Sequence, residues 1–315
     1  MPPNIAPLVR VAVSLCVVFV AATRLEASTP CVARPVTHGT ISTSDHHPAK
    51  DAITIASLNI AGQPKVADAL VAWAHERVVD ILFLQEVGHA STGGEAFVTA
   101  LSERLGFHFA YAPADIVGAA HTQGLAILSR YPLADVRVHP LTYYHLRFRS
   151  RCRIALAATV TTTGGPLRLV NVHLDTRINS HNRVAQLVPV LEALDGVDGA
   201  QIVGGDFNTM NIGWFRTMWP FPYVQRQSAA VRALLASDGF HTPFTGDAPT
   251  FRFLGIPLKL DWLYLKHLEP LDWSVDAVRF TDHRGVWARV TRRPRAQQTD
   301  VLRDVATAAS PHVVH

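Results

Sequence analysis

The sequence contains little sulfur and little charge, and both shortages restrict what the protein can be. Its only cysteines are Cys16, Cys31 and Cys152, and none lies in a Cys/His cluster with the spacing of a zinc site. Charged residues make up 17% of the chain against 48% hydrophobic residues, which argues against global disorder. The net charge of +4 is too small to single out nucleic acid as a partner. We therefore expect a folded protein with a sizeable core.

The chain also lacks a long hydrophobic segment, although an apolar run follows Arg10 near the N-terminus. This run, residues 11–23, is shorter than the roughly 20 apolar residues that a membrane span needs. It fits the hydrophobic region of a signal peptide with cleavage near Ala27, and an uncleaved anchor is the alternative. We therefore expect a secreted or periplasmic protein, or a membrane-anchored one if the signal is retained. In an oxidising compartment Cys31 and Cys152 could form one disulfide.

The remaining chain divides into three parts. Residues 28–50 are rich in Thr, Ser, Pro and His and are typical of a linker, residues 51–291 form the expected catalytic domain, and residues 292–315 form a polar tail. Within the domain, apolar runs predict strands and amphipathic runs predict helices. The strands are expected at 53–60, 79–86, 124–129, 154–161, 167–173, 200–206, 260–265 and 286–290, and the helices at 66–78, 95–105, 182–194 and 229–238. Helices mixed with hairpin-linked strands indicate an α/β sandwich of mixed sheets with outer helices.

Several apolar strands end on a polar residue that can take part in chemistry. Leaving such a group buried without a partner costs roughly 2–7 kcal/mol. A single aspartate or histidine in such a place is more often a cap or a structural residue. Six such segments that converge on one rim of stacked sheets are hard to explain as caps. The residues are Asn59, Glu86, His173, Asp206, Asn208, Asp261, Asp282 and His283.

These residue types suit the hydrolysis of phosphate esters. Carboxylate and amide oxygens are the ligands that Mg²⁺ prefers, whereas the lack of thiolates argues against a dedicated zinc or copper site. Ester hydrolysis at phosphorus needs a metal for the phosphate oxygens, a base for the water and a group that stabilises the leaving oxygen. Asp261 is suited to holding an imidazole in the correct tautomer.

The order of the motifs resembles that of the endonuclease/exonuclease/phosphatase family, which includes DNase I-like nucleases. The motifs are Ser57-Leu58-Asn59, Leu84-Gln85-Glu86, residues 124–130, Asn171-Val172-His173, Gly205-Asp206-Phe207-Asn208, Leu260-Asp261-Trp262 and Asp282-His283. The resemblance covers residues 53–290 and implies a four-layer α/β/β/α sandwich of two mixed sheets. It also implies that Glu86 is the principal Mg²⁺ ligand, supported by Asn59 and Asp282, with Mn²⁺ as the alternative ion.

The same resemblance implies the catalytic roles. His283, oriented by Asp261, would be the general base or a phosphate-binding imidazole. Asp206 would position or activate the attacking water and is the joint candidate for the base. Asn208 would bind the scissile phosphate, and His173 would contact the phosphate or assist the leaving group. The implied course is in-line attack of water on phosphorus with inversion.

For four further residues we favour a structural or solvent-exposed role over a role in the active site. Arg183 is expected to form a structural ion pair. Tyr111, Arg147 and Arg151 could line a phosphate groove, but we favour the interpretation that all three lie in a solvated loop.

The substrate is less well defined. Five aromatic residues occur in residues 214–223, and they are typical either of a lipid-facing or base-stacking platform or of a lid that folds onto the core. We expect a phosphodiesterase or phosphatase that acts on a nucleic acid, a phospholipid headgroup or a small phosphate ester. The alternatives are a secreted DNase-like endonuclease, a phospholipid or sphingomyelin phosphodiesterase, and a catalytically dead binding module. No obligate protein partner is evident, and we expect a monomer.

Overall fold

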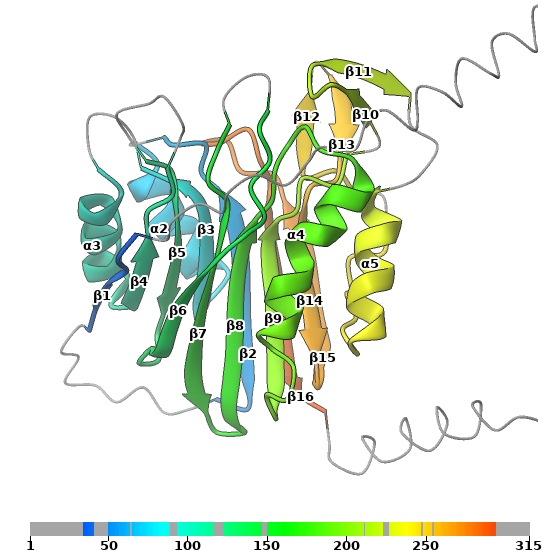
Figure 1. Cartoon of the computed structure of the whole chain (residues 1–315). Coiled ribbons are helices and arrows are strands. Elements are labelled where there is room, and N and C mark those ends of the chain that lie inside the picture. Colours follow the sequence, from blue (N-terminus) through cyan, green and yellow to red (C-terminus); the bar gives the residue numbers. More distant parts are fainter. Residues whose placement is uncertain are drawn as a thin grey trace, which may run out of the picture.

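The fold consists of two β-sheets that face each other, with helices on their outer faces (Figure 1). The structure, a computed structural model, describes residues 34–40, 50–63, 65–88, 93–115, 122–146, 150–210, 212–222, 227–246, 248–253 and 255–293. The predicted four-layer α/β/β/α sandwich is confirmed. The predicted signal peptide and most of the C-terminal tail lie outside the described residues.

The larger sheet has seven strands in the order β1-β4-β5-β3-β2-β16-β15. Helices α2 (Ala67–Glu76) and α3 (Gly94–Leu105) pack on its outer face through Leu70, Trp73 and Leu101. Its strands are β1 (Thr37–Gly39), β2 (Ala52–Asn59), β3 (Ile81–Val87), β4 (His108–Ala112), β5 (Gly124–Ser129), β15 (Leu268–Asp276) and β16 (Gly285–Arg292).

The smaller sheet has five strands in the order β14-β9-β8-β7-β6. Helices α4 (Ser180–Glu192) and α5 (Gln227–Ser237) cover its outer face (Figure 1). Its strands are β6 (Ala134–Pro140), β7 (Ile154–Thr162), β8 (Gly165–His173), β9 (Ala200–Asp206) and β14 (Asp261–Lys266). Two short hairpins, β10 (Ile212–Phe215) with β11 (Trp219–Pro222) and β12 (Phe251–Phe253) with β13 (Ile256–Leu258), lie beyond the sheets.

The alternation of side chains along each strand separates the two apolar layers. In β2, Ile53 and Ile55 face the core between the sheets, whereas Ala56 and Leu58 face helices α2 and α3. Phe83 of β3 packs in the same central core as Val203 of β9. The strands are therefore buried on both faces, which explains why their sequences are nearly continuous apolar runs.

The sheet topology brings the ends of separate strands to one edge. Strands β2 and β3 are parallel, so Asn59 pairs with Gln85 where both strands end. Strands β8 and β9 are also parallel, and His173 pairs with Asp206 at their ends. Strand β14 runs antiparallel to β9 and begins at Asp261, directly opposite Asp206. The polar residues singled out in the sequence therefore meet at one edge because parallel strands end on the same side.

Some strands carry no clear signal in the sequence. Strand β6 has mostly exposed or half-buried side chains, and β15 is exposed along its middle, so neither has a continuous apolar face. Strand β1 lies in the stretch expected to be a linker and pairs with β4 at the sheet edge. Cys152 is disulfide-bonded, and the other two cysteines of the chain, Cys16 and Cys31, both lie outside the described residues. Within the described residues, no helix has the length and apolar character needed to cross a membrane.

A single carboxylate connects helix α2 to the sheet, and its removal should weaken the fold. Asp276 Oδ2 accepts hydrogen bonds from Trp73 Nε1 at 2.9 Å, Arg77 Nε at 2.6 Å and Trp287 Nε1 at 3.1 Å. We expect Asp276→Ala to lower the free energy of unfolding by about 1–3 kcal/mol, because two indole donors lose their acceptor. Urea unfolding checks this, and Asp272→Ala, an exposed carboxylate on the same strand, is the matched control.

The effect of Asp276 should also depend on pH. Burial works to raise the pKa of Asp276, but the hydrogen bonds from Trp73 and Arg77 outweigh it and hold the pKa below its usual value. A carboxyl with a lowered folded pKa adds stability that is present above its unfolded pKa and is lost as the pH falls through the folded one. The difference between the wild type and Asp276→Ala should therefore shrink in acid. A difference that grew in acid would contradict this account.

Candidate active site

A cleft of about 410 Å³ opens at the edge where the strand ends meet. About half of the residues that line it are polar; we call these the polar half and the remaining, apolar residues the apolar half. The polar half contains six of the residues predicted from the sequence: Asn59, Glu86, Asp206, Asn208, Asp282 and His283. The other two predicted residues, His173 and Asp261, lie directly behind them, within 3.5 Å of Asp206 and 2.9 Å of His283 respectively. The fold thus brings all eight together.

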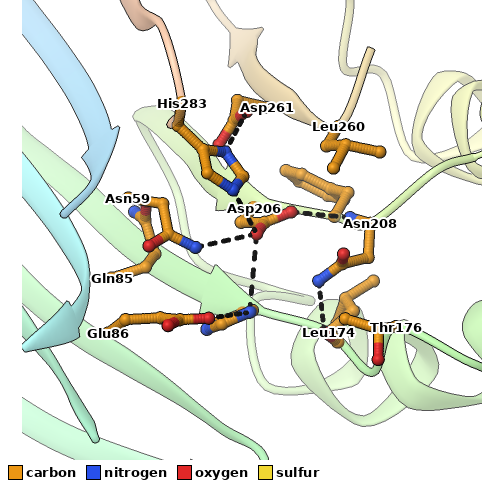
Figure 2. A network of polar contacts seen from close by, with 12 residues as sticks. Asn59, Gln85, Glu86, Leu174, Thr176, Asp206, Asn208, Leu260, Asp261 and His283 are labelled. Atoms are coloured by element: carbon orange, nitrogen blue, oxygen red, sulfur yellow. Dashed lines mark hydrogen bonds and ion pairs between the residues drawn. The ribbon is translucent and has the colours of Figure 1, made fainter. Parts of the chain in front are cut away.

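Asp206 occupies the centre of this group (Figure 2). Its Oδ2 accepts a hydrogen bond from Asn59 Nδ2 at 3.0 Å, and its Oδ1 accepts one from the backbone N–H of Asn208 at 2.9 Å. The same Oδ2 lies 3.5 Å from His173 Nε2 and 3.9 Å from His283 Nε2. The carboxylate is therefore held between two amides and two imidazoles.

The surroundings of Asp206 change its affinity for a proton. Burial and the neighbouring charge of Asp261 raise the pKa of Asp206 to about 7, against the opposing effect of His283 and the two hydrogen-bond donors. A carboxyl group with a pKa near neutrality can both take up and release a proton under physiological conditions. This is the property that a general base in a hydrolase needs.

His283 is fixed in orientation by Asp261. Its Nδ1 lies 2.9 Å from Asp261 Oδ2, and Asp261 has no solvent exposure. This leaves Nε2 directed toward Asp206, as Figure 2 shows. Burial alone would lower the pKa of His283, but the charge and hydrogen bond of Asp261, followed by Asp206 and Asp282, raise it to about 10. The imidazole is therefore held in its protonated form.

Glu86 reaches the cleft because the backbone of β3 changes direction there. Its φ is +55°, and the register between β3 and β5 shifts between Leu84 and Val87. A bulge of this kind re-aims a side chain at the end of a strand. The carboxylate contacts Arg151 Nη1 and Gln123 Nε2, both at 3.2 Å. Its side chain retains 19% of its exposure and is open to the cleft.

His173 lies between the two carboxylates. Its Nε2 is 3.8 Å from Glu86 Oε1 and 3.5 Å from Asp206 Oδ2. Burial, together with the charges of Arg153, Arg151 and His283, holds the pKa of His173 well below its usual value. The ring is therefore neutral, in contrast to His283, so the site pairs one neutral and one charged imidazole.

Asn208 and Asp282 complete the polar half. Asn208 has a φ of +50°, and its Nδ2 donates to the backbone oxygen of Leu174 at 2.9 Å, which ties it to the end of β8 (Figure 2). A residue with positive φ at the end of a strand is uncommon and is often found at functional sites. Asp282 is exposed at the mouth of the cleft, next to His283.

The donors in the cleft fit a hard divalent cation. Glu86, Asp282 and Asn59 all line the cleft and carry carboxylate or amide oxygens, although Asn59 Oδ1 also accepts a hydrogen bond from the backbone N–H of Ala61 at 2.9 Å. A second group, Asp206, Asp261 and His283, has ligand atoms within 4.8 Å of one another. In that group, however, Asp261 already holds His283 Nδ1 in a hydrogen bond, so it is better explained as a positioning network. The residues that would hold the ion are therefore Glu86, Asn59 and Asp282.

Comparison with known sequences places this site in a family. The sequence profile of the Endonuclease/Exonuclease/phosphatase family matches residues 56–312. The chain belongs to this family. The resemblance inferred from the ordered motifs is thereby confirmed, and the chain is a phosphoesterase of the endonuclease/exonuclease/phosphatase type. No protein of curated function matches the sequence.

Solved structures of the family share the fold at low sequence identity. An endonuclease/exonuclease/phosphatase from Beutenbergia cavernae is 19% identical with a TM-score of 0.62, covering 77% of this chain and 72% of its own. The human Nocturnin catalytic domain, solved with bound sulfate, is 18% identical with a TM-score of 0.58, covering 82% and 98%. TDP2 from D. rerio, solved with a single-strand DNA product, is 17% identical with a TM-score of 0.55, covering 77% and 100%.

A buried polar network behind the site was not anticipated from the family motifs. Gln85 Nε2 donates to Asn171 Oδ1 at 2.8 Å and to Ser57 Oγ at 3.0 Å, so it links β2 and β3 to β8 across the core. Asn171 in turn donates to the backbone oxygens of Leu84 and Ala126, both at 2.9 Å. The sequence shows these two amides, Gln85 and Asn171, inside otherwise apolar strands, next to or near the motif residues Glu86 and His173.

The structure gives different results for the four residues that we expected to be structural or solvent-exposed. Arg183 is structural and fully buried, but within the described part of the chain it donates to the backbone oxygens of Phe207 and Ile178 and to the Gln227 side chain in place of the expected ion pair. Arg151 contacts Glu86 and is largely buried, so the solvated-loop interpretation is wrong for it. Tyr111 is buried in the core and Arg147 lies outside the described residues.

Proposed function

We propose that the protein is an exported, metal-dependent phosphoester hydrolase that directs an activated water in line at phosphorus. The observation that carries this proposal is the position of the buried carboxylate of Asp206, which lines the cleft and lies 3.5 Å from His173 Nε2 and 3.9 Å from His283 Nε2. Export rests on the apolar N-terminal run, residues 11–23, which has the composition of a signal peptide.

Mg²⁺, with Mn²⁺ as the alternative, would be held by Glu86, Asn59 and Asp282. When bound, the ion supplies charge neutralisation to the phosphate oxygens. The presence of three oxygen donors in one cleft supports this assignment. Arg151 Nη1 lies 3.2 Å from Glu86 Oε1, and this contact would hold the carboxylate in a fixed orientation beside the cleft.

The chain's own residues would perform the remaining chemistry. Asp206 takes the proton of the attacking water, because its carboxylate is the group that the other polar side chains surround. His283 Nε2 donates to a phosphate oxygen, and Asp261 keeps the ring in position for this. Asn208 lines the cleft beside Asp206 and contributes to phosphate binding. His173 lies behind the cleft lining between Glu86 and Asp206, so its assistance to the departing oxygen rests on the family resemblance.

Removal of divalent metal tests the reaction class. The full-length protein is assayed with bis-p-nitrophenyl phosphate, p-nitrophenyl phosphate, plasmid DNA, sphingomyelin and an inositol phosphate, with Mg²⁺ and with EDTA. We expect turnover of at least one ester with Mg²⁺ and its loss with EDTA, restored by added Mg²⁺ or Mn²⁺. The relative rates on the panel identify the preferred ester. Turnover that survives EDTA, or no turnover with either metal, would contradict the proposal.

A further inference from the structure

The apolar half of the cleft is built by two hairpins from distant parts of the sequence. Trp214 of β10 and Phe251 of β12 pack against Met210, Leu258 and Leu260. All five line the cleft that the polar residues also line, and the Phe251 ring lies 4.7 Å from the ring of His283. Figure 1 shows the two hairpins side by side at one end of the sandwich, beyond both sheets. The site therefore has an apolar wall that extends outward from the reacting groups.

The outer parts of these hairpins carry large apolar side chains that remain in solvent. Trp219 of β11 is 62% exposed, Phe253 of β12 is 47% exposed and Ile256 of β13 is 51% exposed. Phe253 is both exposed and part of the cleft lining, so the exposed apolar surface is continuous with the apolar wall. Exposed apolar surface at the mouth of a binding site usually marks a place where something docks. We call Trp219, Phe253 and Ile256 the apolar rim.

The charged residues within the two hairpins have one sign. Residues 212–222 and 251–258 contain no aspartate or glutamate, and they contain two arginines, Arg216 and Arg252. Both arginines are exposed next to the rim. A surface of tryptophan and aliphatic side chains bordered by arginines matches the boundary between the headgroups and acyl chains of a phospholipid layer.

We propose that the apolar rim docks onto a phospholipid surface, so that the apolar wall of the cleft receives the acyl-bearing part of a lipid and its headgroup phosphate reaches Asp206. This proposal rests on the proposed function for the chemistry, and it adds the class of substrate and the surface on which the substrate is found. Trp219 and Ile256 enter the acyl region, while Arg216 and Arg252 remain at the level of the phosphates.

A single-stranded nucleic acid fits the same surface less well. Binding of a nucleic acid strand requires cations along the path of the backbone and aromatic faces on which bases stack. Two arginines, Arg216 and Arg252, border the rim, and one of its three members, Ile256, is aliphatic and has no face for stacking. These features favour a lipid layer over a strand of nucleic acid.

Vesicle binding by the full-length protein tests the proposal without any need for turnover. Sucrose-loaded phosphatidylcholine vesicles, with and without phosphatidylserine, are sedimented with the wild type and with the double variant Trp219→Ser/Ile256→Ser. We expect the partition constant of the variant to fall by roughly tenfold or more on both vesicle types, because two apolar side chains no longer leave water. Neither residue lines the cleft. Thermal unfolding of the variant establishes that it is folded.

The matched control likewise replaces one tryptophan and one exposed aliphatic residue, at a different place on the surface. Leu271 and Trp273 of β15 are 54% and 45% exposed, and Leu271→Ser/Trp273→Ser should bind vesicles like the wild type. The N-terminal apolar run is common to all three proteins, so it cannot produce a difference between them. Equal binding by all three, equal loss in both variants, or binding of an oligothymidylate that depends on the rim in the absence of vesicle binding would each overturn the proposal. A protein that binds vesicles through the rim but hydrolyses no ester would uphold the docking surface and refute the proposed function.

Discussion

Glu86→Gln is expected to lower Mg²⁺-dependent hydrolysis by roughly 10³-fold or more, because the ion that neutralises the phosphate loses its principal charged ligand. The substitution keeps the size of the side chain and its ability to accept a hydrogen bond from Arg151. The side chain faces the cleft and fills no core volume, so the fold should be unaffected.

The measurement is kcat/KM over a range of Mg²⁺ concentrations, combined with calorimetric titration of Mg²⁺ into the protein. Glu103→Gln, on the exposed face of α3, is the matched control and should behave like the wild type in both measurements. If the Glu86 variant kept its full Mg²⁺ dependence and affinity, the ion would have to be assigned to other residues, with Asp206, Asp261 and His283 as the next candidates.

His283→Ala should lower kcat by roughly 10²–10⁴-fold, the range typical of a lost acid–base or hydrogen-bonding partner in the transition state. The ring is fixed by Asp261 on one side and directs Nε2 toward Asp206 on the other. His75→Ala, on the exposed surface of α2, is the matched control and should have no effect. A loss below tenfold would leave Asp206 as the group that carries the proton chemistry alone.

The role of Asp261 can be separated from that of His283 by a double-mutant cycle. Asp261→Asn keeps the size of the side chain but weakens its hold on the charged ring, so it should lower kcat in the same direction with little change in KM. If Asp261 acts through His283, the double variant should be no slower than His283→Ala. Additive losses would show that Asp261 has a separate function in the cleft.

The fold was predictable where the sequence shows strong local patterns. Strands β2, β3, β8 and β9 have apolar runs that end on a polar residue, and these runs coincide with the strands of the structure. Strands β6 and β15 lack such patterns, because their side chains are partly exposed and need not be apolar. The two hairpins beside the cleft were not predicted either. Side chains of both hairpins pack on a shared apolar cluster of Met210, Leu258 and Leu260, and an isolated two-stranded hairpin is only marginally stable.

The residues of the candidate site were predictable for a related reason. A carboxylate or imidazole at the end of a buried strand needs a partner, and its presence in an apolar run can be seen without a structure. The roles of these residues remain predictions that the variants above test. Arg151 could not be assigned in this way, because it lies in a loop with other arginines and only its contact with Glu86 distinguishes it.

The sequence by itself therefore determined the candidate residues for the chemistry and their places at or just beyond the strands of an α/β sandwich. Only the tertiary structure decided how these residues meet. His173 lies between Glu86 and Asp206 because the parallel pairs β2–β3 and β8–β9 end at one edge of two facing sheets. The tertiary structure also decided that the aromatic segment of β10 and β11 forms a wall of the cleft together with β12 and β13. The physical reason is that burial and periodicity are properties of neighbouring residues, whereas the pairing of distant strands depends on how whole sheets pack.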